Sequence, residues 1–134
     1  MKSACLGVLM LWSTAAAAEA PSLCAEAPNQ TEGTLCAKRR QEAAEAALAK
    51  VQDALQAKLD PVGRLNLDRA QRAWRTFRDL ECHLETGFDA NRPEGNGTVM
   101  PMLLGECATA LTERRTRDLT DQLACPGGDL SCER

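Results

Sequence analysis

Six cysteines and a single histidine are the residues of this chain whose side chains could carry chemistry. The histidine, His83, directly follows a cysteine, and a seventh cysteine lies at the extreme amino terminus. Such residues can form a nucleophile–base pair, a zinc site or a set of disulfides. The six stand at Cys24, Cys36, Cys82, Cys107, Cys125 and Cys132.

The spacing of these residues argues against catalysis and against a metal. Side chains meet on a helix when they are three or four residues apart, so Cys82 and His83, as neighbours, point in different directions. A zinc site needs about four converging ligands, but the chain has one His and no Cys-x-x-Cys spacing. No carboxylate pair stands out as an acid–base couple. We therefore expect no catalytic residue, no metal and no cofactor, and we place His83 at the surface.

The amino-terminal residues favour disulfides. Lys2 precedes an uncharged apolar run at 4–12, and three alanines follow at 16–18. This order is typical of a secretory signal peptide, and the run is too short for a membrane anchor. We predict a cleaved signal peptide at residues 1–18 and a periplasmic or secreted protein with no membrane anchor. Its six remaining cysteines would then reach an oxidising compartment.

The charge of the exported chain disfavours nucleic acid as a partner. Removing residues 1–18 takes away Lys2 as the only charged residue, which leaves 15 basic and 19 acidic residues and a formal charge of −4. Nucleic-acid binding rewards a concentrated positive face, which this composition does not indicate. A basic protein partner is compatible with this charge, although a modest negative charge also keeps an ordinary small domain soluble.

Three amphipathic helices are predicted to position the cysteines. The first, within 35–59 and capped by Thr34, has an apolar stripe at Ala44, Leu48, Val51, Leu55 and Leu59. The second runs from about 62–65 to Glu85, ends at Gly87, and has an inner face of Leu67, Ala70, Trp74, Phe77 and Leu84. After a loop at 86–99, the third helix covers 100–123.

These elements predict an all-α fold, a small disulfide-stapled bundle of about three helices. The second and third helices would form an antiparallel hairpin with the first packed across it. An irregular segment at 19–33 would precede the helical domain at 34–124, and a tail at 125–134 would follow it.

The hairpin favours one of the fifteen possible disulfide pairings. Cys82 and Cys107 would lie near its loop end, where packed helices about 8–10 Å apart let inward-facing cysteines approach within the roughly 7 Å that a bridge allows. Cys24 would then pair with Cys36, and Cys125 with Cys132. The main alternative joins the amino-terminal pair to the carboxy-terminal pair.

The second and third helices carry a pattern of defined residues, and this pattern resembles the N-terminal domain of the LprI-type lysozyme inhibitors. These are small, cysteine-containing helical domains exported by bacteria. The resemblance covers roughly residues 24–123, without the tail cysteines, and departs at Phe77, where the family commonly has Tyr. The matching residues are Leu67, Gln71, Trp74, Phe77, Arg78, Asp79, Cys82, Cys107, Leu111, Arg115, Thr116 and Leu119.

The resemblance implies an exported domain that binds and inhibits lysozyme, a basic protein, by surface contact. It also implies a core role for Trp74, Phe77 and Leu111 and a bridge between Cys82 and Cys107. Gln71, Arg78 and Asp79 would order the helix ends or the contacts between helices. The long loop is our hypothesis for the contact, through Glu94, Asn96 and Thr98. The alternative is a periplasmic interaction or assembly module with another partner on the same scaffold. A hydrolase ranks last, and the oligomeric state is left open.

Overall fold

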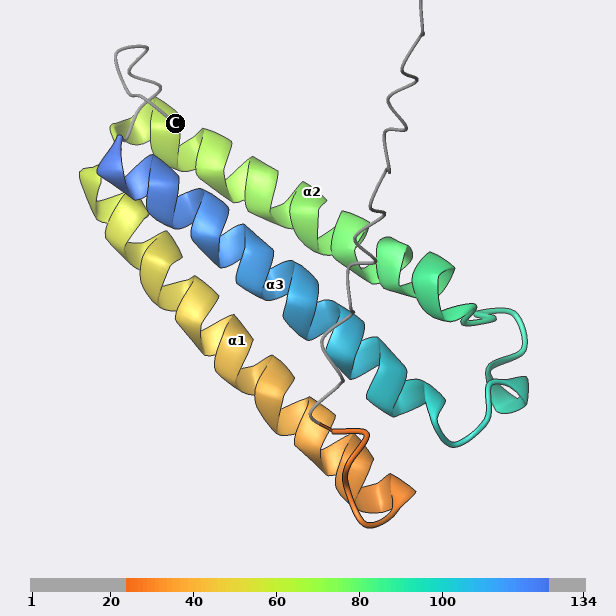
Figure 1. Cartoon of the computed structure of the whole chain (residues 1–134). Helices are drawn as coiled ribbons and strands as arrows, with labels where there is room; N and C mark the ends of the chain where they lie inside the picture. Colours follow the sequence, from red (N-terminus) through yellow and green to blue (C-terminus); the bar gives the residue numbers. More distant parts are fainter. Residues whose placement is uncertain (1–23, 126–134) are drawn as a thin grey trace, which may run out of the picture.

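The computed structural model describes residues 24–125, most of which lie in three long α-helices. Figure 1 shows the helices side by side with α3 in the middle, where α1 and α3 run in one direction and α2 runs against both. The predicted all-α fold is confirmed, and no strand occurs within the described residues. The predicted signal peptide lies outside them. The elements are α1 (Gln30–Lys58), α2 (Pro61–Thr86), the short 3-10 helix η1 (Pro93–Gly95) and α3 (Met100–Ala124).

An asparagine sets the start of α1. The Asn29 side chain accepts a hydrogen bond of 3.0 Å from the backbone amide of Glu32, so the helix begins at Gln30. The prediction that residues up to 33 are irregular and that Thr34 caps this helix is wrong. The reason is that Asn29 caps at least as well as Thr and stands more than one turn earlier.

The carboxy-terminal end of α2 follows the predicted signal, and its start at Pro61 lies just before the predicted 62–65. Asp60 accepts a hydrogen bond of 2.6 Å from the Gly63 amide, and Pro61 occupies the first turn, where its missing N–H costs nothing. Gly87 ends the helix with a φ of 72°, a left-handed conformation that favours glycine. The turn between α1 and α2 is therefore tight, and the two helices leave it in opposite directions.

The most extensive contact between elements joins α1 and α3, while α1 and α2 touch least. Small residues permit it: a Cβ built on Gly105 would lie 3.2 Å from the Cβ of Ala37, so the two backbones approach closely there. We expected α2 and α3 to form the central hairpin with α1 packed across it. That antiparallel hairpin is present and is bridged by Cys82–Cys107, but α1 packs mainly on α3, where small residues let the two helices approach closely.

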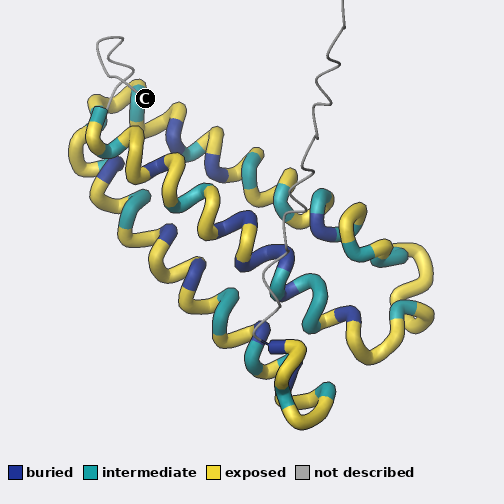
Figure 2. The backbone as a smooth tube through the Cα atoms, viewed as in Figure 1, coloured by how far each residue is buried: buried dark blue, intermediate teal, exposed yellow. Residues whose placement is uncertain are grey.

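Buried residues follow α3 and the side of α1 that faces it (Figure 2). They form two clusters, and the first contains most of the stripe predicted for the first helix. Leu48, Leu55, Leu67 and Leu119 make up the first cluster, with Val51, Leu59, Trp74 and Leu123 packed against it. Cys82, Cys107, Ala108 and Leu111 make up the second, with Leu104 beside them.

The orientation of α2 differs from the prediction. Its buried residues are Leu67, Gln71 and Cys82, whereas the predicted inner-face residue Phe77 is 53% exposed and Leu84 is 77% exposed. Ala70 is exposed as well. The inner-face assignment of these three residues is wrong because polar contacts and a disulfide, described below, fix a different face against α1 and α3.

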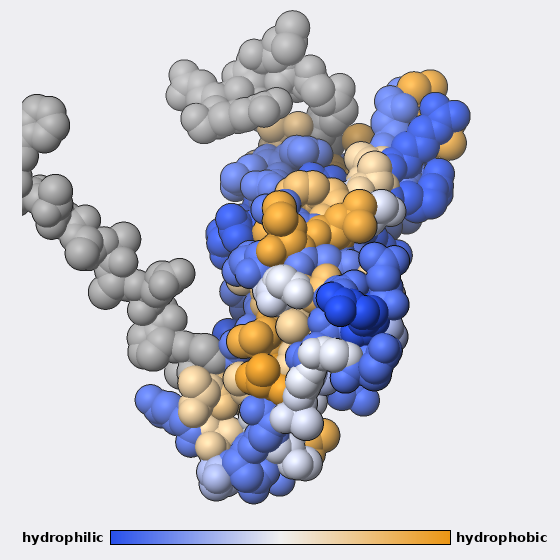
Figure 3. Space-filling model, turned by 90° about the vertical axis from the view of Figure 1, so that its right-hand side faces the viewer, coloured by the Kyte–Doolittle hydropathy of each residue, from blue (hydrophilic) through white to orange (hydrophobic). Residues whose placement is uncertain are grey.

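Apolar side chains consequently reach the surface. On the face shown in Figure 3 they form a broken band between hydrophilic residues. Within residues 24–125, no helix combines the length and the apolarity that crossing a membrane would require.

Candidate functional site

Gln71 connects all three helices through a buried polar network. Its side chain is among the few buried polar ones, and its amide nitrogen donates to Gln52 Oε1 on α1 at 3.1 Å. Its oxygen accepts from Arg115 Nε on α3 at 2.7 Å. Burial lowers the pKa of the Arg115 guanidinium from its usual value, and the negative charge of Asp118 acts against that shift. Gln71, a residue of the family pattern, therefore fixes the rotation of α2 about its axis, because its hydrogen bonds are directional and the contacts of an apolar residue are not.

Arg78 makes a second connection between the helices. Its Nη1 donates to Glu45 Oε1 on α1 at 3.1 Å and lies 3.5 Å from Thr112 Oγ1 on α3. The same guanidinium pairs with Asp79 at 2.9 Å, and its carbon lies 5.4 Å from the ring centroid of Trp74. Within the described chain, no fully buried side-chain nitrogen or oxygen lacks a hydrogen-bond partner. Burying polar groups here is therefore not penalised by unmade hydrogen bonds.

Two disulfides add covalent links, one between α2 and α3 and one at the start of α1. Cys82 on α2 is bonded to Cys107 on α3, with 5.7 Å between their Cα atoms. Cys24 is bonded to Cys36, also with 5.7 Å between Cα atoms, and this bridge fastens the amino-terminal turn to α1. Both bridges agree with the favoured local pairing. The third predicted bridge involves Cys132, which lies outside the described residues.

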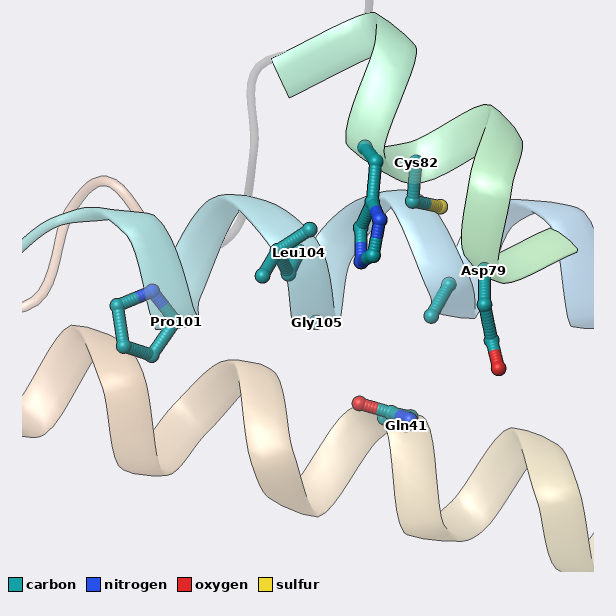
Figure 4. Close-up of a pocket in the computed structure, with 8 residues that line it drawn as sticks. Gln41, Asp79, Cys82, Pro101, Leu104 and Gly105 are labelled. Atoms are coloured by element: carbon teal, nitrogen blue, oxygen red, sulfur yellow. The ribbon is translucent and has the colours of Figure 1, made fainter. Parts of the chain in front are cut away.

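A groove of about 390 Å³ lies between α1 and α2, and residues of α3 form its floor. Figure 4 shows Gln41 on α1 and Asp79 on α2 turned towards it from opposite sides, with Gly105 of α3 also lining it. His83 lines the groove and is half-buried, so its predicted surface position is only partly right. Its ring lies 4.5 Å from that of Phe88.

Cys82 and His83 in the groove do not form a catalytic pair. The sulfur of Cys82 is bonded to another sulfur, so no thiolate stands beside His83 for an imidazole to activate. Among residues 24–125, no group of three or more His, Cys, Asp or Glu side chains is placed to hold a metal ion.

The loop after α2 is organised around Asp89 and Asn96. The Asn96 side chain accepts from the Asp89 amide at 2.7 Å and donates to the Asp89 carbonyl at 2.9 Å. The Asp89 carboxylate accepts from Arg92 Nε and from the Asn91 amide, each at 2.9 Å. The hydrogen bond from Arg92, followed by that from the Asn91 amide, lowers the pKa of Asp89 below its usual value.

These contacts give different roles to the three residues proposed for partner binding. Asn96 is half-buried, and its side-chain hydrogen bonds lie within the loop. Glu94 and Thr98 are exposed on either side of it. Asn96 therefore shapes the loop, whereas Glu94 and Thr98 have side chains that a partner could reach.

Apart from Thr116 and the bridged Cys82 and Cys107, the residues of the family pattern fall into three groups. Leu67, Leu111 and Leu119 are buried, and Trp74 is half-buried against the first cluster. Gln71, Arg78, Asp79 and Arg115 make the polar connections described above. Phe77 is exposed and not part of the core that the resemblance implied.

The partners of the polar residues could not be found from the sequence. Glu45, Gln52 and Thr112 receive hydrogen bonds from Gln71 or Arg78 across 19 to 34 positions of the chain. No motif marks them, and Glu45 and Gln52 read as ordinary polar positions of an amphipathic helix.

Comparisons with known proteins agree with the pattern. The family model described as "Lysozyme inhibitor LprI" matches residues 24–119, which include both disulfides and both polar connections. An uncharacterized protein of Rhizobium meliloti (strain 1021) is 33% identical over 130 residues, covering 87% of this chain and 90% of that protein. No solved structure matches. The chain therefore belongs to the lysozyme inhibitor LprI family.

Proposed function

We propose that this protein binds lysozyme and inhibits it by protein–protein contact, without chemistry of its own. The observation that carries the proposal is the match of the LprI family model to residues 24–119, because the family is one of inhibitors and not of enzymes. A scaffold held by two bridges and two interhelical polar connections supports it, since a rigid surface loses little entropy on binding.

The contact in this proposal is the loop between α2 and α3. Glu94 and Thr98 are exposed there, and Asn96 fastens the backbone that carries them. The exported chain carries a formal charge of −4, so a basic enzyme would be attracted to it. Opposite charges of this kind mainly accelerate the encounter of the two proteins.

Export is part of the same proposal. The two disulfides and the family indicate an exported protein, because such bridges persist in oxidising compartments. We infer that residues 1–18 are the signal peptide that directs this export, to the periplasm or the medium.

The experiment follows the lysis of bacterial cell walls by lysozyme in the presence of the purified, oxidised chain from residue 19. The proposal expects the lysis rate to fall as the protein is added. An unchanged rate at a micromolar excess, with both disulfides confirmed by mass spectrometry, contradicts it and favours the interaction module with another partner.

Loop variants locate the contact. Glu94→Lys should weaken inhibition about tenfold or more if Glu94 faces the basic enzyme, since like charges at a contact are strongly unfavourable. Asp53→Lys makes the same charge change at an exposed position of α1 and serves as the matched control. Equal effects of the two variants would mean that only net charge matters, and that the loop is not the contact.

A further inference from the structure

An exposed apolar stripe runs along α2. It consists of Ala70, Ala73, Phe77, Leu80 and Leu84, all of which are exposed. The three large side chains are 53%, 61% and 77% exposed, in chain order from Phe77. Their spacings of three, four, three and four residues are those of the a and d positions of a coiled-coil seam. Such a stripe fits the apolar face of another helix.

The stripe cannot turn inward within the same molecule. The opposite side of α2 is held by the Cys82–Cys107 bridge and by the hydrogen bonds of Gln71 and Arg78 to α1 and α3. Rotating α2 to bury Phe77 would break these contacts. The apolar side chains are thus kept at the surface by the residues that define the fold.

The charges of α2 indicate which kind of helix would pack against the stripe. Residues 61–75 contain four arginines and Asp68, a formal charge of +3, whereas residues 76–86 contain Arg78 and three acidic residues, a formal charge of −2. This order opposes the helix macrodipole, which favours acidic residues near the first turn and basic residues near the last. A helix of the same sequence packed antiparallel would set each basic half against an acidic half.

We propose that α2 is a homodimerisation surface, on which the α2 of a second copy packs antiparallel along the stripe. The contact is isologous, with a two-fold axis near Ala73 and Phe77, as is usual in symmetric dimers. One helix per subunit gives an interface at the small end of the range, so the dissociation constant should be micromolar. The antiparallel geometry leaves the two 87–99 loops at opposite ends of the dimer. This inference goes beyond the proposed function and involves no lysozyme.

Sedimentation equilibrium of the oxidised chain from residue 19, between about 1 µM and about 1 mM, tests the dimer. The mass should rise from one copy to two across this range. Leu80→Glu should keep the protein monomeric throughout, whereas Leu35→Glu, at an exposed leucine of α1, should leave the dimer unchanged. Both substitutions are at surface positions, and circular dichroism checks that each variant folds. A wild-type chain that stays monomeric at about 1 mM, or a Leu80→Glu variant that still dimerises, overturns the proposal.

Charge reversal tests the antiparallel direction. Changing Arg69 and Arg72 together to Glu should raise the dissociation constant about tenfold at low salt, because both halves of α2 are then acidic. Adding Glu81→Arg and Glu85→Arg should restore dimerisation, since the halves are again opposite in charge. In a parallel pair, like halves already face each other. A first variant that dimerises as well as the wild type therefore contradicts the antiparallel arrangement.

Discussion

Replacing Gln71 should disturb the packing of the three helices more than replacing another side chain of similar size. Gln71→Leu nearly keeps the volume but leaves the Arg115 Nε–H and the Gln52 amide oxygen without their partner. Unmade hydrogen bonds at buried groups cost about 1–3 kcal/mol, and a charged donor lies at the upper end. The free energy of unfolding in urea should fall by that amount.

The control for this prediction is Gln122→Leu, at an exposed position of α3. It should change the free energy of unfolding by no more than about 0.5 kcal/mol. If the two variants lose the same stability, the network around Gln71 contributes nothing specific.

Asp89 makes the loop after α2 sensitive to acid. Its pKa is lowered from the usual value by the hydrogen bond of Arg92, then by that of the Asn91 amide. A carboxyl whose pKa is lower in the folded state stabilises the loop above its unfolded pKa and loses that contribution as the pH falls through its folded pKa.

The measurement is a nuclear magnetic resonance titration of the Asn91 amide from about pH 7 to about pH 2, with a midpoint expected below that of an unperturbed aspartate, about 3.9. Asp89→Asn should remove the transition. A midpoint at or above the unperturbed value would contradict the loop geometry.

At the scale of the elements, the parallel contact of α1 with α3 depends on the absence of a side chain at Gly105. A Cβ built there would lie 3.2 Å from that of Ala37, and a branched side chain would push the helices apart. Gly105→Val should therefore lower the free energy of unfolding by about 1–3 kcal/mol, the usual range for overpacking.

Ala110→Val is the matched control, because it places the same side chain at an exposed site on the same helix. Its cost should be limited to helix propensity, less than about 0.7 kcal/mol. Thermal unfolding of both variants gives the comparison. If Gly105→Val is no more costly than Ala110→Val, the helices do not approach as closely as described.

The existence of the three helices could be predicted because glycines and apolar periodicity are local signals, whereas the start of α1 was placed too late because Asn29 caps it before Thr34. Gly87 ends α2 where expected, and Ala44, Leu48 and Leu55 of the predicted stripe are buried. The rotation of α2 could not be predicted. Periodicity favoured turning Phe77 and Leu84 inward, but Gln71, Arg78 and Cys82 find partners on α1 and α3 that are distant in the sequence. The loop residues that we propose for partner binding carry no sequence signal beyond their polarity and charge.

At the scale of the whole molecule, the Cys82–Cys107 bridge holds the carboxy-terminal end of α2 on the other helices. Replacing both cysteines by serine should lower the free energy of unfolding by about 3–4 kcal/mol, from the entropy of the loop that the bridge closes. Hydrogen exchange should accelerate most in the last turns of α2, because the polar connections remain nearer its middle.

The double replacement of Cys24 and Cys36 is the comparison, since it also removes one bridge but lies at the start of α1. It should leave exchange in the last turns of α2 closer to that of the intact protein. Equal acceleration there in both variants would mean that neither bridge acts locally.

Inhibition of lysozyme by a folded surface is the central claim, and titration of lysozyme with the oxidised chain tests it most directly. We predict a lysis rate that falls with added protein and reaches a plateau near equivalence, together with heat of binding at the same ratio in calorimetry. Reduced and alkylated protein should inhibit less, because its scaffold is loosened. No heat of binding and no loss of lysis rate with the oxidised protein would contradict the account.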